Sequence, residues 1–312
     1  AHRYAVPYMW GTCGILYNKA HVPQKDAKTW GTLWNKRYRG KLLMKDSYRD
    51  SYGTALIWAH HKELAQGSMT VDQLMNDYSP SAINTVLKHL KALKPNIEGW
   101  EADFGKETMT KGKAWLNMTW SGDAAWAIDE ADKVGVKLGY EVPDEGSNVW
   151  FDGWVIPRYS RNSKAAAFFI NYLCQTHAAI ANMKTTGYVS SVASKEILES
   201  MSDTKAYPQE TDLSYFFGEA GHKAHLNPIM YPDSSVVARC AMIHDAGDHM
   251  AEVLDMWSKV KGDNLRNGLA IFLLSVITIL TAFVAVKKYK LYKHKRLSRK
   301  HRRHHVIRLS MK

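Results

Sequence analysis

Acidic and aromatic side chains gather at the ends of three predicted strands. These strands, 40–44, 114–119 and 149–156, carry or lead into Asp46, Ser47, Asp50, Trp120, Asp123, Trp150 and Asp152. Ligands of open α/β sheets bind at the carboxyl ends of strands. A carboxylate pairs with an ammonium group, and a ring face adds cation–π attraction while covering a methylene stem. The set therefore indicates a site for an organic cation, although a capping Asp or a core Trp explains any single member equally well.

Motifs for catalysis or metal binding are weak. The sequence has no G-x-S-x-G, H-E-x-x-H or P-loop pattern. His60 and His61 lack partners at metal-ligand spacing, and Cys13 has no assignable His or Asn that would make it a nucleophile. We therefore expect no catalytic residue, no metal and no cofactor, and we predict that the protein is not an enzyme.

The elements that must position these side chains alternate between strands and helices. Short strands are predicted at 4–7 and 14–18, around a Trp/Gly turn, and further strands at 40–44, 114–119, 136–142 and 149–156. Helices are predicted at 51–62, after the Ser79-Pro80 start signal, at 164–174 with Phe168 and Phe169 toward the buried side, and at 250–260. This alternation predicts an α/β fold with a largely parallel sheet.

Charge is distributed unevenly along the 312 residues. The chain carries 42 Lys and Arg against 30 Asp and Glu, and twelve of the basic residues lie in 287–312, which has no acidic residue. The first 286 residues are therefore balanced, with 30 basic and 30 acidic side chains. This balance argues against a basic nucleic-acid groove across the body, and we expect no nucleic-acid partner.

The segment 268–286 has 19 residues without a charge or a proline. At 1.5 Å per residue it would span roughly 28 Å, about one hydrocarbon core. The basic stretch that follows would stay in the cytoplasm and leave the body outside. The alternatives are a buried helix of a soluble core for this segment and a nucleic-acid role for the tail. We predict a single C-terminal transmembrane helix at the cell membrane, with the body periplasmic or extracellular and the C-terminus cytoplasmic.

A series of sequence blocks resembles the spermidine/putrescine-binding proteins of polyamine ABC importers, within the bacterial extracellular solute-binding proteins. The blocks follow family order over residues 4 to about 260: VPYMWGT from Val6, WGTLWNKRYRGKLL from Trp30, LMKDSYRDSY from Leu43, LKPN from Leu93, WSGDA from Trp120, VPDEGSNVWFDGWVIP from Val142, NYL from Asn171 and GYV from Gly187. The resemblance implies a two-lobed periplasmic-binding-protein-like (type II) fold with a ligand cleft between the lobes. It also implies a receptor that delivers a polyamine, putrescine or spermidine, to ABC permease subunits and their ATPase.

The resemblance also implies ligand-binding residues. Trp120, Trp150 and Tyr188 match the aromatic box of the family, and Asp50, Asp123 and Asp152 match its acidic positions. Trp10 and Ser47 lie in the matching blocks and complete the predicted set, although Ser47 replaces an Asp of spermidine-type members and Ala102 replaces a Ser of some members. These departures leave the choice of polyamine open.

The resulting domain plan has four parts. Residues 1–262 form a solute-binding domain whose N-terminal half-lobe is incomplete, 263–267 a short stalk, 268–286 the transmembrane helix and 287–312 a basic cytoplasmic tail. We expect the lobes to be joined near Asn18 and again near Trp150. The alternative function is a receptor of the same fold for another cationic solute, or a sensory solute-binding domain.

Overall fold

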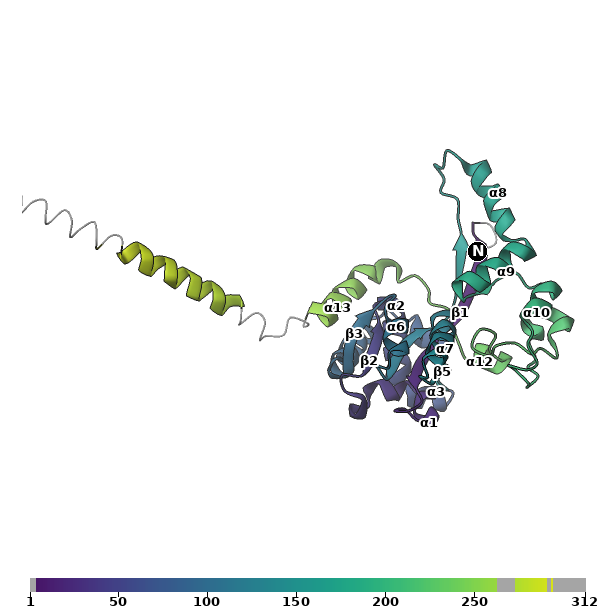
Figure 1. The fold of residues 1–312 in the computed structure, drawn as a ribbon, viewed down its shortest axis with the longest axis horizontal. Helices are drawn as coiled ribbons and strands as arrows, with labels where there is room; N and C mark the ends of the chain where they lie inside the picture. The colour runs from purple at the N-terminus through teal and green to yellow at the C-terminus, as the bar shows by residue number, and fades with distance from the viewer. Residues whose placement is uncertain (1–3, 263–272, 291–292, 294–312) are drawn as a thin grey trace, which may run out of the picture. The chain divides into compact units, whose positions relative to one another are not determined.

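The computed structural model describes residues 4–262, 273–290 and 293. The chain divides into two compact units, residues 1–257 and 258–312. The larger unit contains two hydrophobic cores, one around Leu16 and Leu43 and the other around Met183 and Tyr231. These cores belong to two lobes, which the strand β1 (Val6–Asn18) connects (Figure 1).

One lobe is built on a five-stranded mixed sheet. Its strand order is β3-β2-β4-β1-β5, formed by β1, β2 (Leu42–Lys45), β3 (Ile97–Glu101), β4 (Leu116–Trp120) and β5 (Leu138–Glu141). Strand β2 runs parallel to β3 and β4, whereas β1 runs antiparallel to β4 and β5. The expectation of a largely parallel sheet is therefore wrong, because β1 enters from the other lobe and runs against its neighbours.

Strand β1 is one 13-residue strand and not the two short strands expected around a Trp/Gly turn. Its glycines are required by close neighbours from distant parts of the chain. A Cβ at Gly11 would lie 2.8 Å from the Trp150 ring, and one at Gly14 would lie 2.5 Å from the backbone oxygen of Glu141. Glycine at these positions therefore permits close strand packing and does not mark a turn.

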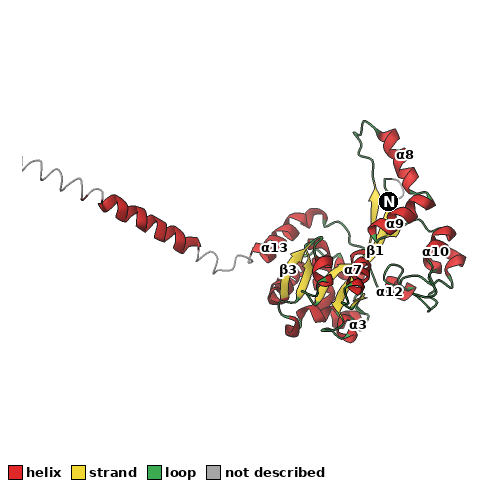
Figure 2. Ribbon diagram, in the orientation of Figure 1, coloured by secondary structure: helices red, strands yellow, loops and turns green. Residues whose placement is uncertain are grey.

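Helices cover the mixed sheet (Figure 2). They are α1 (Gln24–Ala27), α2 (Tyr48–Ala59), α3 (His61–Ala65), α4 (Val71–Met75), α5 (Pro80–Leu93), α6 (Gly105–Thr110) and α7 (Ser121–Lys133), with 3₁₀ turns at Trp30–Trp34, Lys36–Tyr38 and Lys94–Asn96. The predicted start of α5 is confirmed, since the Ser79 side chain accepts a hydrogen bond from the Ala82 amide. Its apolar face is buried through Ile83, Val86 and Leu90.

The second lobe uses the first half of β1. Strands β6 (Val149–Trp154) and β7 (Val189–Ser190) both pair antiparallel with it. The helices of this lobe are α8 (Ser163–Leu173), α9 (Thr176–Thr186), α10 (Lys195–Met201), α11 (Ser214–Phe217) and α12 (Ser234–Ala238), with a 3₁₀ turn at Gly218–Gly221. The core between them includes Trp10, Ile197 and Leu213.

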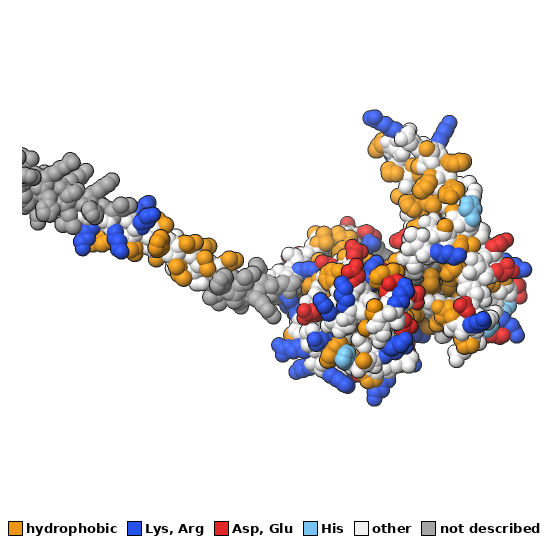
Figure 3. Space-filling view, viewed as in Figure 1, with side chains coloured by type: hydrophobic (Ala, Val, Ile, Leu, Met, Phe, Trp, Pro, Cys, Tyr) orange, Lys and Arg blue, Asp and Glu red, His pale blue; other side chains and the backbone are white. Residues whose placement is uncertain are grey.

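Helix α8 leaves most of its apolar side chains exposed. Phe168 is 77% exposed and Phe169 is 53% exposed, so the prediction that both face the buried side is wrong. Only Ile170 of this helix is buried. Hydrophobic side chains gather over α8 in Figure 3. The helical spacing marked an apolar face, but among the described residues no element covers it.

The chain then returns to the mixed-sheet lobe through a 3₁₀ turn (Gly247–His249) and α13 (Met250–Gly262). The Trp100 and Trp257 rings meet edge to face, with centroids 4.9 Å apart, and anchor this return.

In the smaller unit, residues 273–290 are helical with exposed side chains. The first five residues of the predicted membrane segment, 268–272, and most of the predicted tail lie outside the described residues. In the part of the chain that is described, no helix combines the length and the apolar character of a membrane span.

Candidate functional site

A cavity of about 720 Å³ lies where the two lobes meet. Its walls come from both lobes and from the segments that join them: Met9, Ser47, Arg49, Asp50, Trp120, Asn148, Val149, Trp150, Phe151, Asp152, Thr186, Tyr188, Met242 and Ile243. Six of the eight predicted ligand-binding residues line it, and Asp123 and Trp10 do not. The volume is in the range of small-molecule sites.

Three chain segments run side by side next to this cavity and join the lobes. The Cys13 amide donates to the Asn148 carbonyl at 2.9 Å, and the Val149 amide donates to the Ala241 carbonyl at 3.0 Å. The Ser147 hydroxyl adds a 2.6 Å hydrogen bond to the Cys13 carbonyl. Strand β1 therefore crosses between the lobes at Cys13 and not near Asn18. The chain crosses between the lobes a second time at residues 147–149, beside Trp150. It crosses a third time at Ala241, which is hydrogen-bonded to Ser147 and Val149.

Ser47 and Asp50 stand at the start of α2. The Ser47 side chain caps this helix by accepting a hydrogen bond from the Asp50 amide. The Asp50 carboxylate is buried and accepts a 3.0 Å hydrogen bond from Asn148 Nδ2, which ties the helix to the lobe junction. Asn148 Oδ1 is buried without a hydrogen-bond partner among the described residues. It is therefore a candidate acceptor for a ligand N–H group.

Aromatic rings form the other walls. Trp150 and Tyr188 meet edge to face with ring centroids 5.5 Å apart, and Trp120 lies at the end of β4. Burial raises the pKa of the Tyr188 hydroxyl, and the Asp123 carboxylate next to it raises that pKa further. Tyr188 is therefore neutral at physiological pH and acts as a hydrogen-bond donor toward Asp123.

Asp152 lines the cavity from β6. Its desolvation raises the pKa of the carboxyl group above the usual 3.8. Among the described residues no salt bridge pairs this carboxylate with a Lys or Arg. A positively charged ligand would recover the electrostatic cost of holding Asp152 ionised in this position.

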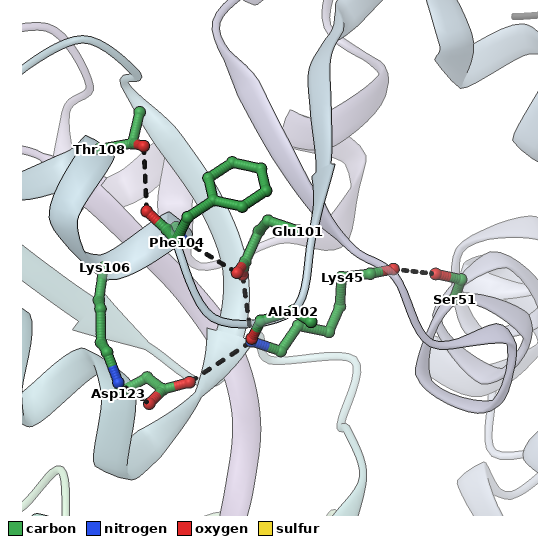
Figure 4. A network of polar contacts seen from close by, with 9 residues as sticks. Lys45, Ser51, Glu101, Ala102, Phe104, Lys106, Thr108 and Asp123 are labelled. Atoms are coloured by element: carbon green, nitrogen blue, oxygen red, sulfur yellow. Dashed lines mark hydrogen bonds and ion pairs between the residues drawn. The ribbon is translucent and has the colours of Figure 1, made fainter.

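Asp123 is instead held by the protein itself. Its carboxylate oxygens lie 3.4 Å from the Lys45 ammonium and 3.4 Å from the Lys106 ammonium (Figure 4). Lys45 also contacts Glu101 at 3.1 Å, and both of these side chains are 1% exposed. Asp123 therefore lies in a four-residue ion cluster of Lys45, Glu101, Lys106 and Asp123, none of which lines the cavity.

Trp10 lies in the core of the second lobe. It is 8% exposed, and its ring centroid lies 5.4 Å from that of Phe216. Trp10 pairs with the cavity-lining Phe151 across β1 and β6, but its own side chain is not among those that line the cavity.

Sequence reasoning did not select Arg49, Asn148 or Lys45. Arg49 and Asn148 line the cavity, and each lies within two residues of a predicted ligand-binding position. Of these three, Lys45 could have been found from the sequence. A lysine at the end of an otherwise apolar, buried strand needs buried hydrogen-bond or charge partners. No group of three or more possible metal-ligating side chains occurs among the residues that the structure describes.

Comparison with models of protein families assigns the chain to a family. Residues 2–209 match the model of the bacterial extracellular solute-binding proteins. The chain belongs to that family. This membership points to a binding protein.

The chain is similar to proteins named for polyamines. It is 29% identical over 214 residues to the spermidine/putrescine-binding periplasmic protein of Salmonella typhimurium, which covers 68% of this chain and 57% of the relative. It is also 29% identical over 208 residues to the protein of that name from Escherichia coli, covering 66% and 55%. The chain therefore spans little more than half the length of these relatives.

A solved structure supports the fold. The substrate-binding protein of a spermidine/putrescine ABC transporter from Streptococcus pneumoniae aligns with a TM-score of 0.61 and 24% identity. The alignment covers 83% of this chain and 69% of that one. The two-lobed solute-binding fold with mixed α/β content follows from this likeness together with the two cores.

Gly122 offers a direct test of the aromatic wall of this solute-binding protein. A Cβ at this position would lie 2.4 Å from the Tyr188 ring, so Gly122→Ala is expected to displace that ring. We expect ligand affinity to fall by about tenfold, because a preformed aromatic contact is lost. Gly99→Ala is the matched control, because a Cβ at Gly99 would meet no atom closer than 3.6 Å and Gly99 does not line the cavity. Equal affinities of Gly122→Ala and wild type, by isothermal titration calorimetry, would remove Tyr188 from the site.

Proposed function

We propose that this chain is the solute-binding component of an ABC importer and that it captures a polyamine outside the cytoplasm. The observation that carries the proposal is the position of two carboxylates, Asp50 and Asp152, in one cavity with the aromatic rings of Trp120, Trp150 and Tyr188. Each carboxylate can pair with one ammonium group of a ligand, while the rings cover the methylene chain between them. The names of the relatives from Salmonella and Escherichia coli support the same ligand class.

Calorimetry of the full 312-residue chain tests this proposal. The panel contains putrescine, spermidine, 1,4-butanediol and γ-aminobutyrate. Butanediol has the carbon chain of putrescine without its charges, and γ-aminobutyrate replaces one of the two ammonium groups by a carboxylate. Saturable binding of a polyamine, with none of butanediol, is the expected result. Binding of γ-aminobutyrate, which carries no net charge, in preference to both polyamines would contradict a site for polyamines.

Delivery to a permease is the second part of the proposal. A receptor that closes on its ligand presents both lobes to membrane partners, and motion at the three-segment junction would permit such closure. Permease subunits and their ATPase are therefore the partners that we propose. Uptake of labelled putrescine by cells should depend on this chain and on the ATPase together. Uptake that persists without this chain would instead favour a sensory role.

The proposal also includes a membrane tether, which rests on the sequence alone. Residues 268–286 lack charge, and twelve cationic residues follow them. Such a basic flank favours a cytoplasmic C-terminus. Protease added to intact spheroplasts should then remove the body and spare an epitope placed after Lys312. Cleavage of that epitope would show that the C-terminus lies outside the cytoplasm, which contradicts an extracytoplasmic receptor body.

A further inference from the structure

Lys45 is a lysine whose ammonium group is held entirely inside the protein. The side chain is 1% exposed and ends strand β2. Its Nζ atom donates to Glu101 Oε1 at 3.1 Å and to the Ala102 carbonyl at 2.9 Å. It also lies 3.4 Å from Asp123 Oδ2 and 4.0 Å from the centroid of the Trp120 ring. Figure 4 shows the side chain reaching between Glu101 and Asp123.

These partners are those that an ammonium group of a ligand would use. A carboxylate beside the face of a Trp ring binds organic cations through charge pairing and cation–π attraction. Here Asp123 supplies the carboxylate and Trp120 the ring, and Trp120 also lines the cavity. Lys45 therefore places a cation from the protein where the sequence alone predicted one from the ligand.

The charges of the cluster are already balanced. Lys45 and Lys106 contribute two positive charges, and Glu101 and Asp123 contribute two negative ones. A ligand ammonium brought to Asp123 would meet the buried Lys45 ammonium and the partly exposed Lys106 ammonium, and these like charges repel it. Asp50 and Asp152 lie outside the cluster and remain the cavity carboxylates for a ligand.

We infer that Lys45 is a built-in ammonium that occupies the Asp123–Trp120 cation position and restricts the cavity to diamines. A triamine needs a third anionic position, and the carboxylate beside the cavity-lining Trp120 is already paired with Lys45. The inference rests on the proposed polyamine-binding function and adds the residue that selects among polyamines. In this reading, Asp123 contributes to selectivity through Lys45 and not through direct contact with the ligand.

The test compares putrescine, a diamine, with spermidine, a triamine, in the full chain. Lys45→Met removes the ammonium but leaves the buried Glu101 carboxylate without its nearest partner, so this variant can fail to fold. Lys45→Met/Glu101→Gln removes both buried charges together and keeps the cluster neutral. Lys41→Met is the matched control, because Lys41 lies over Trp115 at 5.3 Å and neither residue lines the cavity. Circular dichroism establishes that each variant is folded before its affinities are measured.

Wild type is expected to bind putrescine more tightly than spermidine, by about tenfold or more, because the added ammonium meets Lys45. The double variant should shift this ratio toward spermidine by about tenfold or more, since the Trp120 face is freed and only Lys106 still pairs with Asp123. Lys41→Met should leave the ratio unchanged.

The possible results distinguish a failure of the Lys45 inference from a failure of the proposed polyamine-binding function. An unchanged ratio in a folded double variant that still binds putrescine overturns the inference and leaves the proposed function in place. Equal binding of both ligands by wild type overturns it as well. If wild type binds no polyamine but the double variant binds spermidine, the role of Lys45 stands and the proposed function fails. If neither binds any polyamine, both are overturned.

Discussion

Replacing Asp152 by asparagine is expected to weaken putrescine binding by roughly thirtyfold, a loss of about 2 kcal/mol. The substitution keeps the size of the side chain and removes only its charge. An ammonium group of the ligand is then left without its carboxylate, while the aromatic walls stay in place. The effect lies at the lower end for charged pairs because Asp152 is exposed to solvent in the ligand-free protein. Calorimetry of the full chain measures the change.

Asp132→Asn is the control for Asp152→Asn. Asp132 forms a 2.9 Å ion pair with Lys137, is half exposed and does not line the cavity. Its replacement should leave the affinity for putrescine unchanged. If Asp152→Asn behaves like this control, Asp152 does not hold the ligand and the cation site has to be sought elsewhere in the cavity.

The pH dependence of binding follows from the same carboxylate. Desolvation raises the pKa of Asp152, so its charge is lost at a higher pH than that of an ordinary aspartate. The amines of the ligand stay protonated throughout, since their pKa values lie near 10. Affinity should therefore fall on acidification, starting above the usual titration range of Asp. Without ligand the sign for folding is opposite, because a raised carboxyl pKa removes stability as the pH rises through the folded value.

Measurements of Kd from neutral to mildly acidic pH would show this dependence in wild type. The Asp152→Asn variant should lose the part of the decline that Asp152 causes. A wild-type affinity that stays constant over the whole range would contradict the assignment of an ionised, desolvated Asp152 to the site.

The sequence predicted those features that depend on local chemistry. The start of α5 follows from a capping serine before a proline, two neighbouring residues that stabilise a helix start wherever they occur. The position of Ser47 and Asp50 in the cavity could likewise be predicted, because both follow directly after an apolar strand. The positions of Trp150 and Asp152 could be predicted for a similar reason, since both belong to a strand that lines the cavity.

Features that depend on distant neighbours were not predictable in this way. Gly11 reads as a turn residue until Trp150, far along the chain, is seen to pack against it. The sequence around Asp123 does not reveal that Lys45 and Lys106, both distant in the chain, pair with its carboxylate. Phe168 and Phe169 form an apolar face at helical spacing, and spacing alone does not state which element covers such a face.

The ion cluster has a second expected consequence, for stability. Glu101→Gln should lower the free energy of unfolding by about 3–5 kcal/mol, because it leaves the buried Lys45 ammonium without its nearest carboxylate. Glu101 Oε2 also accepts a 3.1 Å hydrogen bond from the Gly105 amide at the start of α6, so the change loosens this helix too. Urea denaturation of the full chain, followed by circular dichroism, measures the loss.

Glu107→Gln on the same helix is the matched control. Glu107 pairs with Lys111 at 3.8 Å, and both side chains are more than 60% exposed, so its replacement should cost about 0.5 kcal/mol or less. The double variant Lys45→Met/Glu101→Gln should recover part of the loss, since no buried charge is then left unpaired. A cost of Glu101→Gln no greater than that of the control would mean that water or another side chain replaces the carboxylate. Lys45 would then be free to move, and its ammonium could not act as a fixed cation against a triamine.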